Sequence, residues 1–409
     1  MKETGYRWSE TPRKLCYVLI PLLIAFLLLD NNFRIIGRGF LNPTIKKYSI
    51  FGTEPNATLI EDQALIFNSS DIRPDLQEKS FFSYQLTNST LYTLCRNSDL
   101  FEMLETIQNY EDRFNSRYNY DWVFLNDEPF TEEFQKLISN AVSGTAKFGL
   151  IPIEHWSFPE SLDIDHMNDR INVMMNDHEG PLPYADSISY RHMCRFESGF
   201  FYKHELLLDY DYFWRVEPGV KLYCDINYDI FKEMVENDYK YGFTISTIEY
   251  PKTIPSLFKN VHDYLLETDQ SNLLNNDTNY SRFIYDSKKE NYNLCHFWTN
   301  FEIGNLNVFR SKSYNDVFEY LDKRNGFFYE RWGDAPIRSI ILSLILNQGD
   351  IKRFEDIGYK HNPYLQCPQN EEIRLQNRCS CNPKEDFTEL LYSCSWFFDR
   401  IQKELSSVF

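Results

Sequence analysis

The chain has 409 residues, of which 43% are hydrophobic and 17% aromatic, a composition typical of a folded protein and not of a disordered one. Its 42 basic and 60 acidic residues give a formal net charge of −18. This charge argues against a nucleic-acid partner, because nucleic-acid-binding proteins neutralise phosphates with clustered Lys and Arg.

A charge-free apolar run follows a basic N-terminal segment. Residues 15–29 are preceded by Arg13 and Lys14 and closed by Asp30. A helix of this length spans about 22 Å. This is shorter than the hydrocarbon layer of the thin membranes of the early secretory pathway, which is about 27 Å thick, and shorter still than that of the plasma membrane. Basic residues precede the run and no small-residue cleavage pattern follows it, which favours an uncleaved signal anchor over a cleaved signal peptide or a buried helix. We therefore expect a cytoplasmic tail over 1–14 and a lumenal remainder.

Residues 30–82 lack sustained periodicity, so we expect a lumenal stem followed by a folded domain over 83–409. Eight cysteines follow the apolar run, and an even count in an oxidising compartment suggests disulfides whose connectivity is open. Asn-x-Ser/Thr sequons, whose use is also open, begin at Asn56, Asn68, Asn88, Asn276 and Asn279.

Within the folded domain, apolar runs of two kinds alternate. Short runs bounded by polar or turn residues predict strands over 91–94, 122–125, 148–153, 212–216, 241–245 and 303–309. Runs with helical spacing predict helices over 100–114, 131–142, 227–237, 314–321 and 335–346. This alternation predicts an α/β sheet with helices on both faces, in which ligands bind at the carboxyl ends of strands.

The predicted strand 212–216 ends in a polar segment. Arg215 and Glu217 share one face, and Pro218 and Gly219 stop the strand. Glu217 is a candidate metal ligand and Arg215 a candidate diphosphate donor, whereas the alternative is an ion pair without a ligand. Asp209-Tyr210-Asp211 resembles a metal-binding Asp-x-Asp motif, but it precedes the strand and is the weaker candidate.

Further candidates lie later in the chain. Glu302 stands between Phe301 and Ile303, where burial would raise its pKa or make it a partner for Arg, and the alternative is a structural carboxylate. Asp334, two residues before Pro336, is predicted to be an ordinary N-terminal helix cap. His361 is expected in a loop, as a metal ligand or as a surface residue.

These segments, in this order, resemble the fungal Golgi α-1,2-mannosyltransferases of glycosyltransferase family 15. Three of the matching segments are Trp-Arg-Val-Glu-Pro-Gly (214–219), Phe-Trp-Thr-Asn-Phe-Glu-Ile-Gly (297–304) and Tyr-Glu-Arg-Trp-Gly-Asp-Ala-Pro (329–336). The others are 123–130, 189–196, 241–246 and 358–363, so the resemblance covers nearly all of the folded domain.

The resemblance implies a GT-A-like mixed sheet flanked by helices, GDP-mannose as donor, Mn²⁺ as cofactor and retention of the anomeric configuration. By position, Glu217 and His361 match metal ligands, and Glu302 matches a carboxylate that acts as a nucleophile or stabilises an oxocarbenium ion. The remaining matches are Tyr190 beside the diphosphate, Arg96 and Arg215 in the donor pocket, and Asp334 on the acceptor side.

The departures from the family pattern concern acceptor preference. Ile337 and Arg338 stand where the family suggests Val-His, and Lys360 and Asn362 flank His361. The expected function is transfer of mannose to mannose-terminated N- or O-linked glycans by a single-pass type II Golgi protein. Assembly with other glycosyltransferases is a further possibility that the resemblance raises. The alternatives are a lumenal transferase with another nucleotide-sugar donor and a catalytically silent binding subunit.

Overall fold

The computed structural model describes residues 86–180, 182–286 and 291–406. All of them belong to the second of two compact units, Phe81–Phe409. The expected tail, anchor and stem, 1–14, 15–29 and 30–82, lie outside the described residues. Within the described ranges, no helix is long and apolar enough to cross a membrane.

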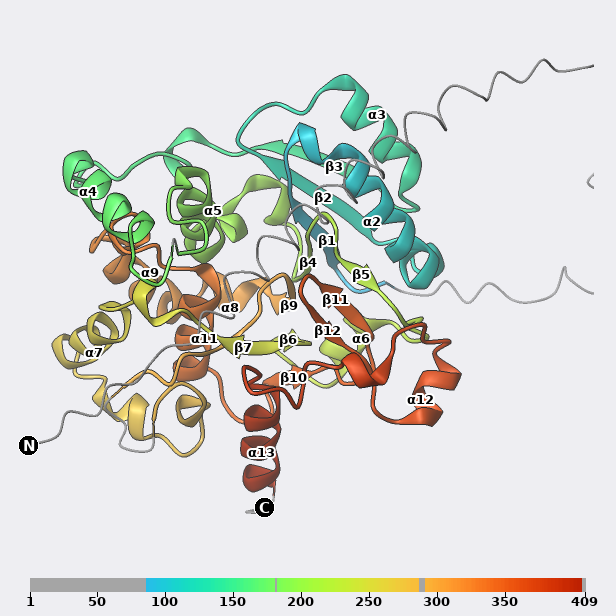
Figure 1. Cartoon of the computed structure of the whole chain (residues 1–409). Coiled ribbons are helices and arrows are strands. Elements are labelled where there is room, and N and C mark those ends of the chain that lie inside the picture. The colour runs from blue at the N-terminus through green and yellow to red at the C-terminus, as the bar shows by residue number, and fades with distance from the viewer. Residues whose placement is uncertain (1–85, 181, 287–290, 407–409) are drawn as a thin grey trace, which may run out of the picture. The chain divides into compact units, whose positions relative to one another are not determined.

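A seven-stranded mixed sheet forms the centre of this unit (Figure 1). Its strands, in spatial order, are β10 (Ile351–Arg353), β6 (Tyr241–Phe243), β9 (Phe301–Asn305), β4 (Tyr212–Val216), β1 (Ser89–Leu94), β2 (Asp121–Asn126) and β3 (Ala146–Leu150). Strand β9 runs antiparallel to β4 and β6, and the other neighbours pair in parallel. The predicted α/β sheet is therefore confirmed, with β9 making it mixed.

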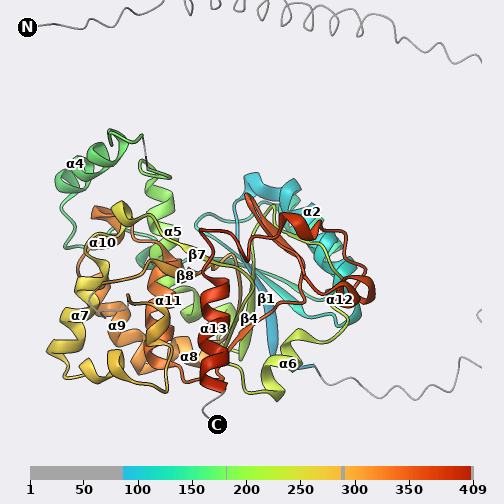
Figure 2. The same ribbon diagram turned by 60° about the horizontal axis from the view of Figure 1, so that its bottom comes forward.

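Helices cover both faces of this sheet (Figures 1 and 2). The α-helices of the described residues are α2 (Leu100–Arg113), α3 (Glu132–Ala141), α4 (Ile164–Met175), α5 (Ile188–Gly199), α6 (Ile230–Glu236), α7 (Leu257–Glu267), α8 (Leu306–Arg310), α9 (Lys312–Asp322), α10 (Gly326–Tyr329), α11 (Asp334–Ile345), α12 (Glu371–Gln376) and α13 (Ser395–Ser406). Along β2, Trp122 and Phe124 pack on the side of α2, α3 and α6, whereas Val123 and Leu125 pack on the side of α5, α9 and α11. Burial on both faces explains why residues 122–125 of this strand are all apolar.

Two small antiparallel sheets complete the unit. One joins β12 (Tyr364–Gln366), β11 (Tyr359–His361) and β5 (Lys221–Leu222), and the other joins β7 (Ser246–Ile248) to β8 (Cys295–Phe297). His361, expected in a loop, instead ends β11 and pairs with Tyr364. The short strands β5, β11 and β12 depend on pairing between distant segments, which local periodicity does not reveal.

The structure corrects two further local predictions. The strand expected over 303–309 ends at Asn305, whose side chain accepts a hydrogen bond from the Asn307 N–H and so starts α8. Asp334, expected as a helix cap, is the first residue inside α11, because Gly333 takes the cap position. Its carboxylate is consequently available for contacts outside the helix.

Among the described residues, two disulfides attach the C-terminal part of the domain to its body, and a third lies within that part. The described residues form the pairs Cys224–Cys379, Cys295–Cys394 and Cys367–Cys381. Cys95 and Cys194 are free thiols, and both are buried. The even cysteine count therefore predicted that disulfides form, but not that two thiols stay unpaired.

The sequons that the structure describes differ in accessibility. Asn279 is 3% exposed, and its amide nitrogen donates to the backbone oxygens of Leu273 (2.8 Å) and Leu344 (3.0 Å). Asn88 is exposed and Asn276 is half-buried. A glycan on Asn279 would need the nitrogen that makes both of these buried hydrogen bonds.

We therefore expect Asn279 to be unmodified in protein purified from a eukaryotic secretory host, since a buried carbonyl that loses its partner costs about 1–3 kcal/mol. Mass spectrometry of tryptic and chymotryptic peptides measures the occupancy, with Asn88 as the accessible comparison. Detection of a glycopeptide carrying sugar on Asn279 in folded protein would contradict this expectation.

Candidate active site

A cavity of about 710 Å³ lies beside the carboxyl end of β4. Five of the residues singled out in the sequence line it: Tyr190, Arg215, Glu217, Asp334 and His361. They come from α5, β4 and its following turn, α11 and β11, so the fold brings together segments that are far apart in the chain. The position agrees with the rule that ligands bind at the carboxyl ends of strands.

Glu217 and His361 face each other across this cavity. Glu217 follows β4, and the chain then turns at Gly219 (φ +84°) into β5, which pairs with β11. This pairing places Nε2 of His361 3.6 Å from Oε2 of Glu217, while Nδ1 of His361 lies 2.9 Å from the carbonyl oxygen of Asn362. Although burial opposes both charges, the nearby carboxylate of Glu217 raises the pKa of His361, and Arg215 followed by His361 lowers the pKa of Glu217 to about 2.

A carboxylate oxygen and an imidazole nitrogen at this separation suit a divalent metal such as Mn²⁺. Within the described residues, no group of three or more His, Cys, Asp and Glu side chains gathers in a way that could hold a metal. The donor set thus fits an ion that takes its other ligands from a substrate or from water, as metal sites that bind phosphates do.

Arg215 connects the carboxylates of the site. Its guanidinium lies 2.6 Å from Glu217, 2.7 Å from Asp334, 3.7 Å from Glu197 and 3.8 Å from Glu302. Burial disfavours its charge, but these four carboxylates outweigh burial and raise its pKa. Because Arg215 binds Oε1 of Glu217, the other oxygen of that carboxylate is directed to His361.

Glu302 lies beneath the cavity and is fully buried. Opposite Arg215 in the β4–β9 register, it accepts hydrogen bonds from Arg338 (2.8 Å) and the Tyr241 hydroxyl (3.0 Å). Burial raises its pKa, against the effect of Arg338 and Arg215. Both expectations for Glu302, a raised pKa and pairing with Arg, are found, yet it is not among the described residues that line the cavity.

Asp334 and Tyr190 belong to the cavity wall. One oxygen of Asp334 accepts hydrogen bonds from Arg215 (2.7 Å) and the Thr299 hydroxyl (2.8 Å). The Tyr190 ring stacks on Tyr184 with centroids 4.5 Å apart, and burial raises the pKa of Tyr190. A planar aromatic pair of this kind offers a surface for a flat ligand group.

Arg96 lies in a smaller adjoining cavity of about 260 Å³ at the carboxyl ends of β1 and β2. Tyr184, Tyr190 and Met193 line both cavities. The Arg96 side chain donates to the Ser189 hydroxyl at the start of α5. The structure therefore places Arg96 next to Tyr190 and in a separate compartment from Glu217 and His361.

Two residues at the site, Glu197 and Trp298, were not named as site residues from the sequence, although Trp298 lies in the matching segment 297–304. Glu197 on α5 bonds to the Tyr92 hydroxyl (2.8 Å), and burial raises its pKa to about 7 in spite of Arg215. Trp298 packs its ring 4.8 Å from that of His361. For Glu197, the chain offers no local signal, because its role depends on the packing of α5 against β4.

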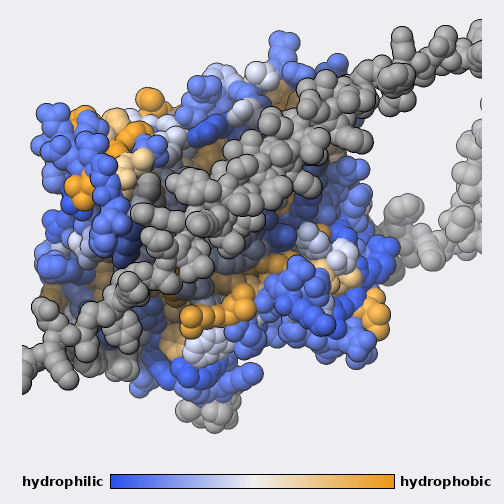
Figure 3. Space-filling model, viewed as in Figure 1, coloured by the Kyte–Doolittle hydropathy of each residue, from blue (hydrophilic) through white to orange (hydrophobic). Residues whose placement is uncertain are grey.

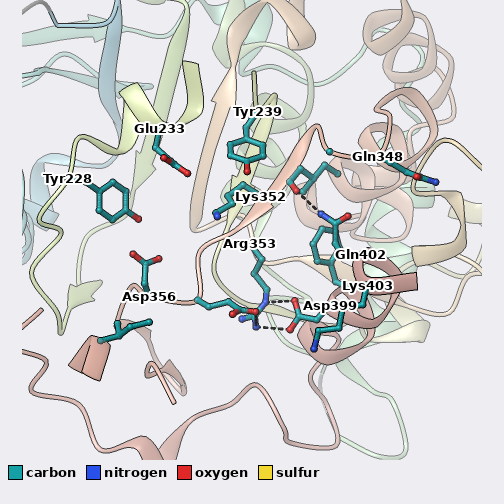
Figure 4. Close-up of a pocket in the computed structure, with 15 residues that line it drawn as sticks. Tyr228, Glu233, Tyr239, Gln348, Lys352, Arg353, Asp356, Asp399, Gln402 and Lys403 are labelled. Atoms are coloured by element: carbon teal, nitrogen blue, oxygen red, sulfur yellow. Dashed lines mark hydrogen bonds and ion pairs between the residues drawn. The ribbon is translucent and has the colours of Figure 1, made fainter. Parts of the chain in front are cut away.

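Two other features lie away from this site. Asp211 precedes β4, at the end opposite to Glu217, and its carboxylate accepts hydrogen bonds from Asn88 (3.3 Å) and Asn307 (3.5 Å). A cavity of about 790 Å³ lies between β10 and α13 (Figure 4). There Arg353 is paired with Asp399 at 2.6 Å, and none of the seven site residues is among the described residues that line it.

Comparison with known proteins agrees with this arrangement. A family model described as glycolipid 2-alpha-mannosyltransferase matches residues 54–403. The chain is 54% identical to the probable mannosyltransferase MNT3 of Candida albicans over 382 residues, 93% of this chain and 97% of that protein. It is 51% identical to alpha-1,2 mannosyltransferase KTR1 of Saccharomyces cerevisiae over 315 residues, 77% of this chain and 79% of that protein.

Among solved structures, core-mannan synthase A of Aspergillus fumigatus in its Mn/GDP form aligns with a TM-score of 0.71 and 36% identity, covering 78% of this chain and 86% of that one. The mannosyltransferase Ktr4p of S. cerevisiae in complex with GDP aligns with a TM-score of 0.72 and 37% identity, covering 77% and 82%. The family match, these relatives and the shared fold lead to one conclusion: the chain belongs to glycosyltransferase family 15 and is a mannosyltransferase.

Proposed function

We propose that this chain transfers mannose from GDP-mannose to mannose-terminated N- or O-linked glycans, forming α-1,2 linkages with retention and with the assistance of Mn²⁺. The supporting observation is the meeting of Glu217 and His361, 3.6 Å apart, beside the buried cation Arg215. The names of the relatives and the Mn/GDP form of core-mannan synthase A support the choice of donor and metal.

We assign Oε2 of Glu217 and Nε2 of His361 to the metal. When bound, Mn²⁺ supplies a positive charge next to the departing diphosphate. Arg215 orients Glu217 for this role and adds a second, fixed positive charge to the same wall of the cavity. The smaller cavity, which Arg96 and the Tyr184–Tyr190 stack both line, suits the nucleoside part of the donor.

The two carboxylates Asp334 and Glu302 receive different roles. Asp334 lines the cavity, where its carboxylate can accept a hydrogen bond from the acceptor hydroxyl. Glu302 is enclosed by Arg338, Tyr241 and Arg215. Its burial favours electrostatic stabilisation of positive charge at C1 over covalent attack, since a nucleophile must touch the reacting carbon.

We propose the same division of the whole chain as the sequence suggests. Residues 1–14 form a cytoplasmic tail, 15–29 a signal anchor, 30–82 a stem and 83–409 the catalytic domain of a type II Golgi protein. The disulfides of the folded domain support an oxidising compartment. Protease protection of a C-terminal epitope in intact microsomes tests this topology.

The donor can be tested directly by calorimetry. We expect GDP-mannose, in the presence of Mn²⁺, to bind at least about 100-fold more tightly than UDP-galactose or UDP-GlcNAc, a difference of about 2.7 kcal/mol. If a UDP-sugar binds as tightly as GDP-mannose or more tightly, the proposed donor is wrong. The proposal that this cavity is a transferase site would be unaffected.

Replacing either proposed metal ligand should abolish metal-dependent transfer. We expect Glu217→Gln and His361→Ala each to lower kcat by about 100-fold or more, the effect of losing a group that stabilises charge on the leaving group. Calorimetric titration of Mn²⁺ in the presence of GDP should show weaker binding for both variants. Asp209→Ala, an exposed carboxylate near the start of β4, is the matched control and should keep wild-type activity. Turnover that is independent of Mn²⁺ would contradict the assignment.

Glu302→Gln and Asp334→Asn should separate the two carboxylate roles. For Glu302→Gln we expect nearly wild-type GDP affinity with a loss in kcat of about 100-fold, because the charge acts at the transition state. For Asp334→Asn we expect the KM for the acceptor to rise while the KM for GDP-mannose stays within twofold, roughly 0.4 kcal/mol. Glutamine is preferred to alanine at 302, because removing the side chain would leave Arg338 buried without its partner at a cost of about 3–5 kcal/mol. A large loss of GDP affinity in Glu302→Gln would exclude the proposed role.

A further inference from the structure

A second cavity adjoins the active-site cavity across a thin partition. It has a volume of about 680 Å³, and Ile248 of β7 lines both cavities. The partition consists of β7 and the segment 391–394, which Thr247 and Ser393 join as an antiparallel bridge. Tyr392 faces the active-site cavity, whereas Leu391 and Ser393 line the second one. A ligand that extends out of the first cavity over this partition therefore reaches the second.

The top of this partition is exposed and apolar. Leu391 is 88% exposed, Tyr392 56% and Trp396, at the start of α13, 44%. On the face seen in Figure 3, apolar side chains gather close above α13. Exposed large apolar residues are often scattered singly, so three of them within six residues of chain are a candidate binding surface. We refer to Leu391, Tyr392 and Trp396 as the C-terminal ridge.

The charges of the second cavity suit a neutral ligand. Arg282 and Arg400 line it, and both lie next to Glu404, at 2.6 Å and 3.9 Å. The cavity also contains the carboxylates of Asp277 and Asp286. Because these cations already have acidic neighbours, the lining favours an uncharged molecule rich in hydroxyl groups over a phosphate or a strongly charged peptide.

The ridge is held in place from two sides. The disulfide Cys295–Cys394 ties it to β8, and the Thr247 hydroxyl donates to the Tyr392 carbonyl oxygen at 2.9 Å. The Cys394 N–H also donates to the Ser246 carbonyl oxygen at 3.0 Å. A binding surface fixed in this way loses little conformational entropy when a ligand binds.

We propose that the second cavity and the C-terminal ridge bind the sugar units of an oligomannose acceptor that lie beyond the mannose receiving the transfer. Aromatic faces carry partial negative charge and pack on the C–H faces of pyranose rings, while the hydroxyl groups meet the polar lining. This inference rests on the proposed mannosyl transfer, and it deepens it: the enzyme selects acceptors by the length of their mannose chain.

The test compares a short acceptor, methyl α-mannoside, with mannopentaose on the purified full-length chain. For Trp396→Ala and Leu391→Ala we expect the KM for mannopentaose to rise about tenfold, which corresponds to about 1.4 kcal/mol. The KM values for methyl α-mannoside and for GDP-mannose should change less than twofold. Phe101→Ala and Leu375→Ala are matched controls, since these side chains are 70% and 74% exposed on α2 and α12, and they should match the wild type for all substrates.

A binding measurement makes the outcome independent of turnover. Calorimetric titration of mannopentaose without donor should give a Kd that rises about tenfold in Trp396→Ala. Equal changes for the short and long acceptors, unchanged mannopentaose binding in the ridge variants, or an effect of these variants on a peptide acceptor alone would overturn the inference. Failure of GDP-mannose turnover with every acceptor would instead defeat the proposed function, and mannopentaose binding would still report on the ridge.

Discussion

A single buried cation, Arg215, organises the site and much of the packing around it. Its guanidinium lies within 4 Å of Glu197, Glu217, Glu302 and Asp334, which come from α5, the end of β4, β9 and α11. Burying a positive or a negative charge alone would cost several kcal/mol of folding free energy, so the arginine and the carboxylates offset the cost of burying one another. The same contacts that join these elements also fix the geometry of the cavity.

The charges in this cluster do not cancel, and this imbalance bears on the nucleotide-diphosphate donor proposed for an acidic protein. Four carboxylates surround Arg215, and Arg338 supplies a second buried cation on the side of Glu302. Burial raises the pKa of Glu197 to about 7, which reduces but does not remove the excess of negative charge. Of the four carboxylates, Glu217 and Asp334 line the cavity, where their negative charge would favour the proposed divalent cation, and that cation would in turn favour phosphates. The net charge of −18 is thus compatible with the proposed donor.

Local sequence patterns predict much of the fold. The parts that they do not predict depend on contacts between distant segments of the chain. Strand β4 was predicted at its observed bounds, because Pro218 and Gly219 end it sharply. The run 303–309 is predicted as one strand, because its apolar residues do not reveal that the strand ends and a helix begins at Asn305. His361 was expected in a loop, because β11 is formed only by pairing with β5 and β12. Five of the seven predicted site residues share one cavity, whereas Glu302 lies beneath it and Arg96 beside it.

The disulfide Cys224–Cys379 has a consequence for where the protein can become active. Cys224 lies shortly after Glu217, and Cys379 anchors the segment that follows the strands β11 and β12. The bond fastens together the two stretches that carry Glu217 and His361, in addition to the β5–β11 pairing and the backbone hydrogen bond from Tyr223 to Gly358. Reduction of Cys224–Cys379 would loosen the connection between these two stretches, so an oxidising environment would keep the proposed metal ligands in register.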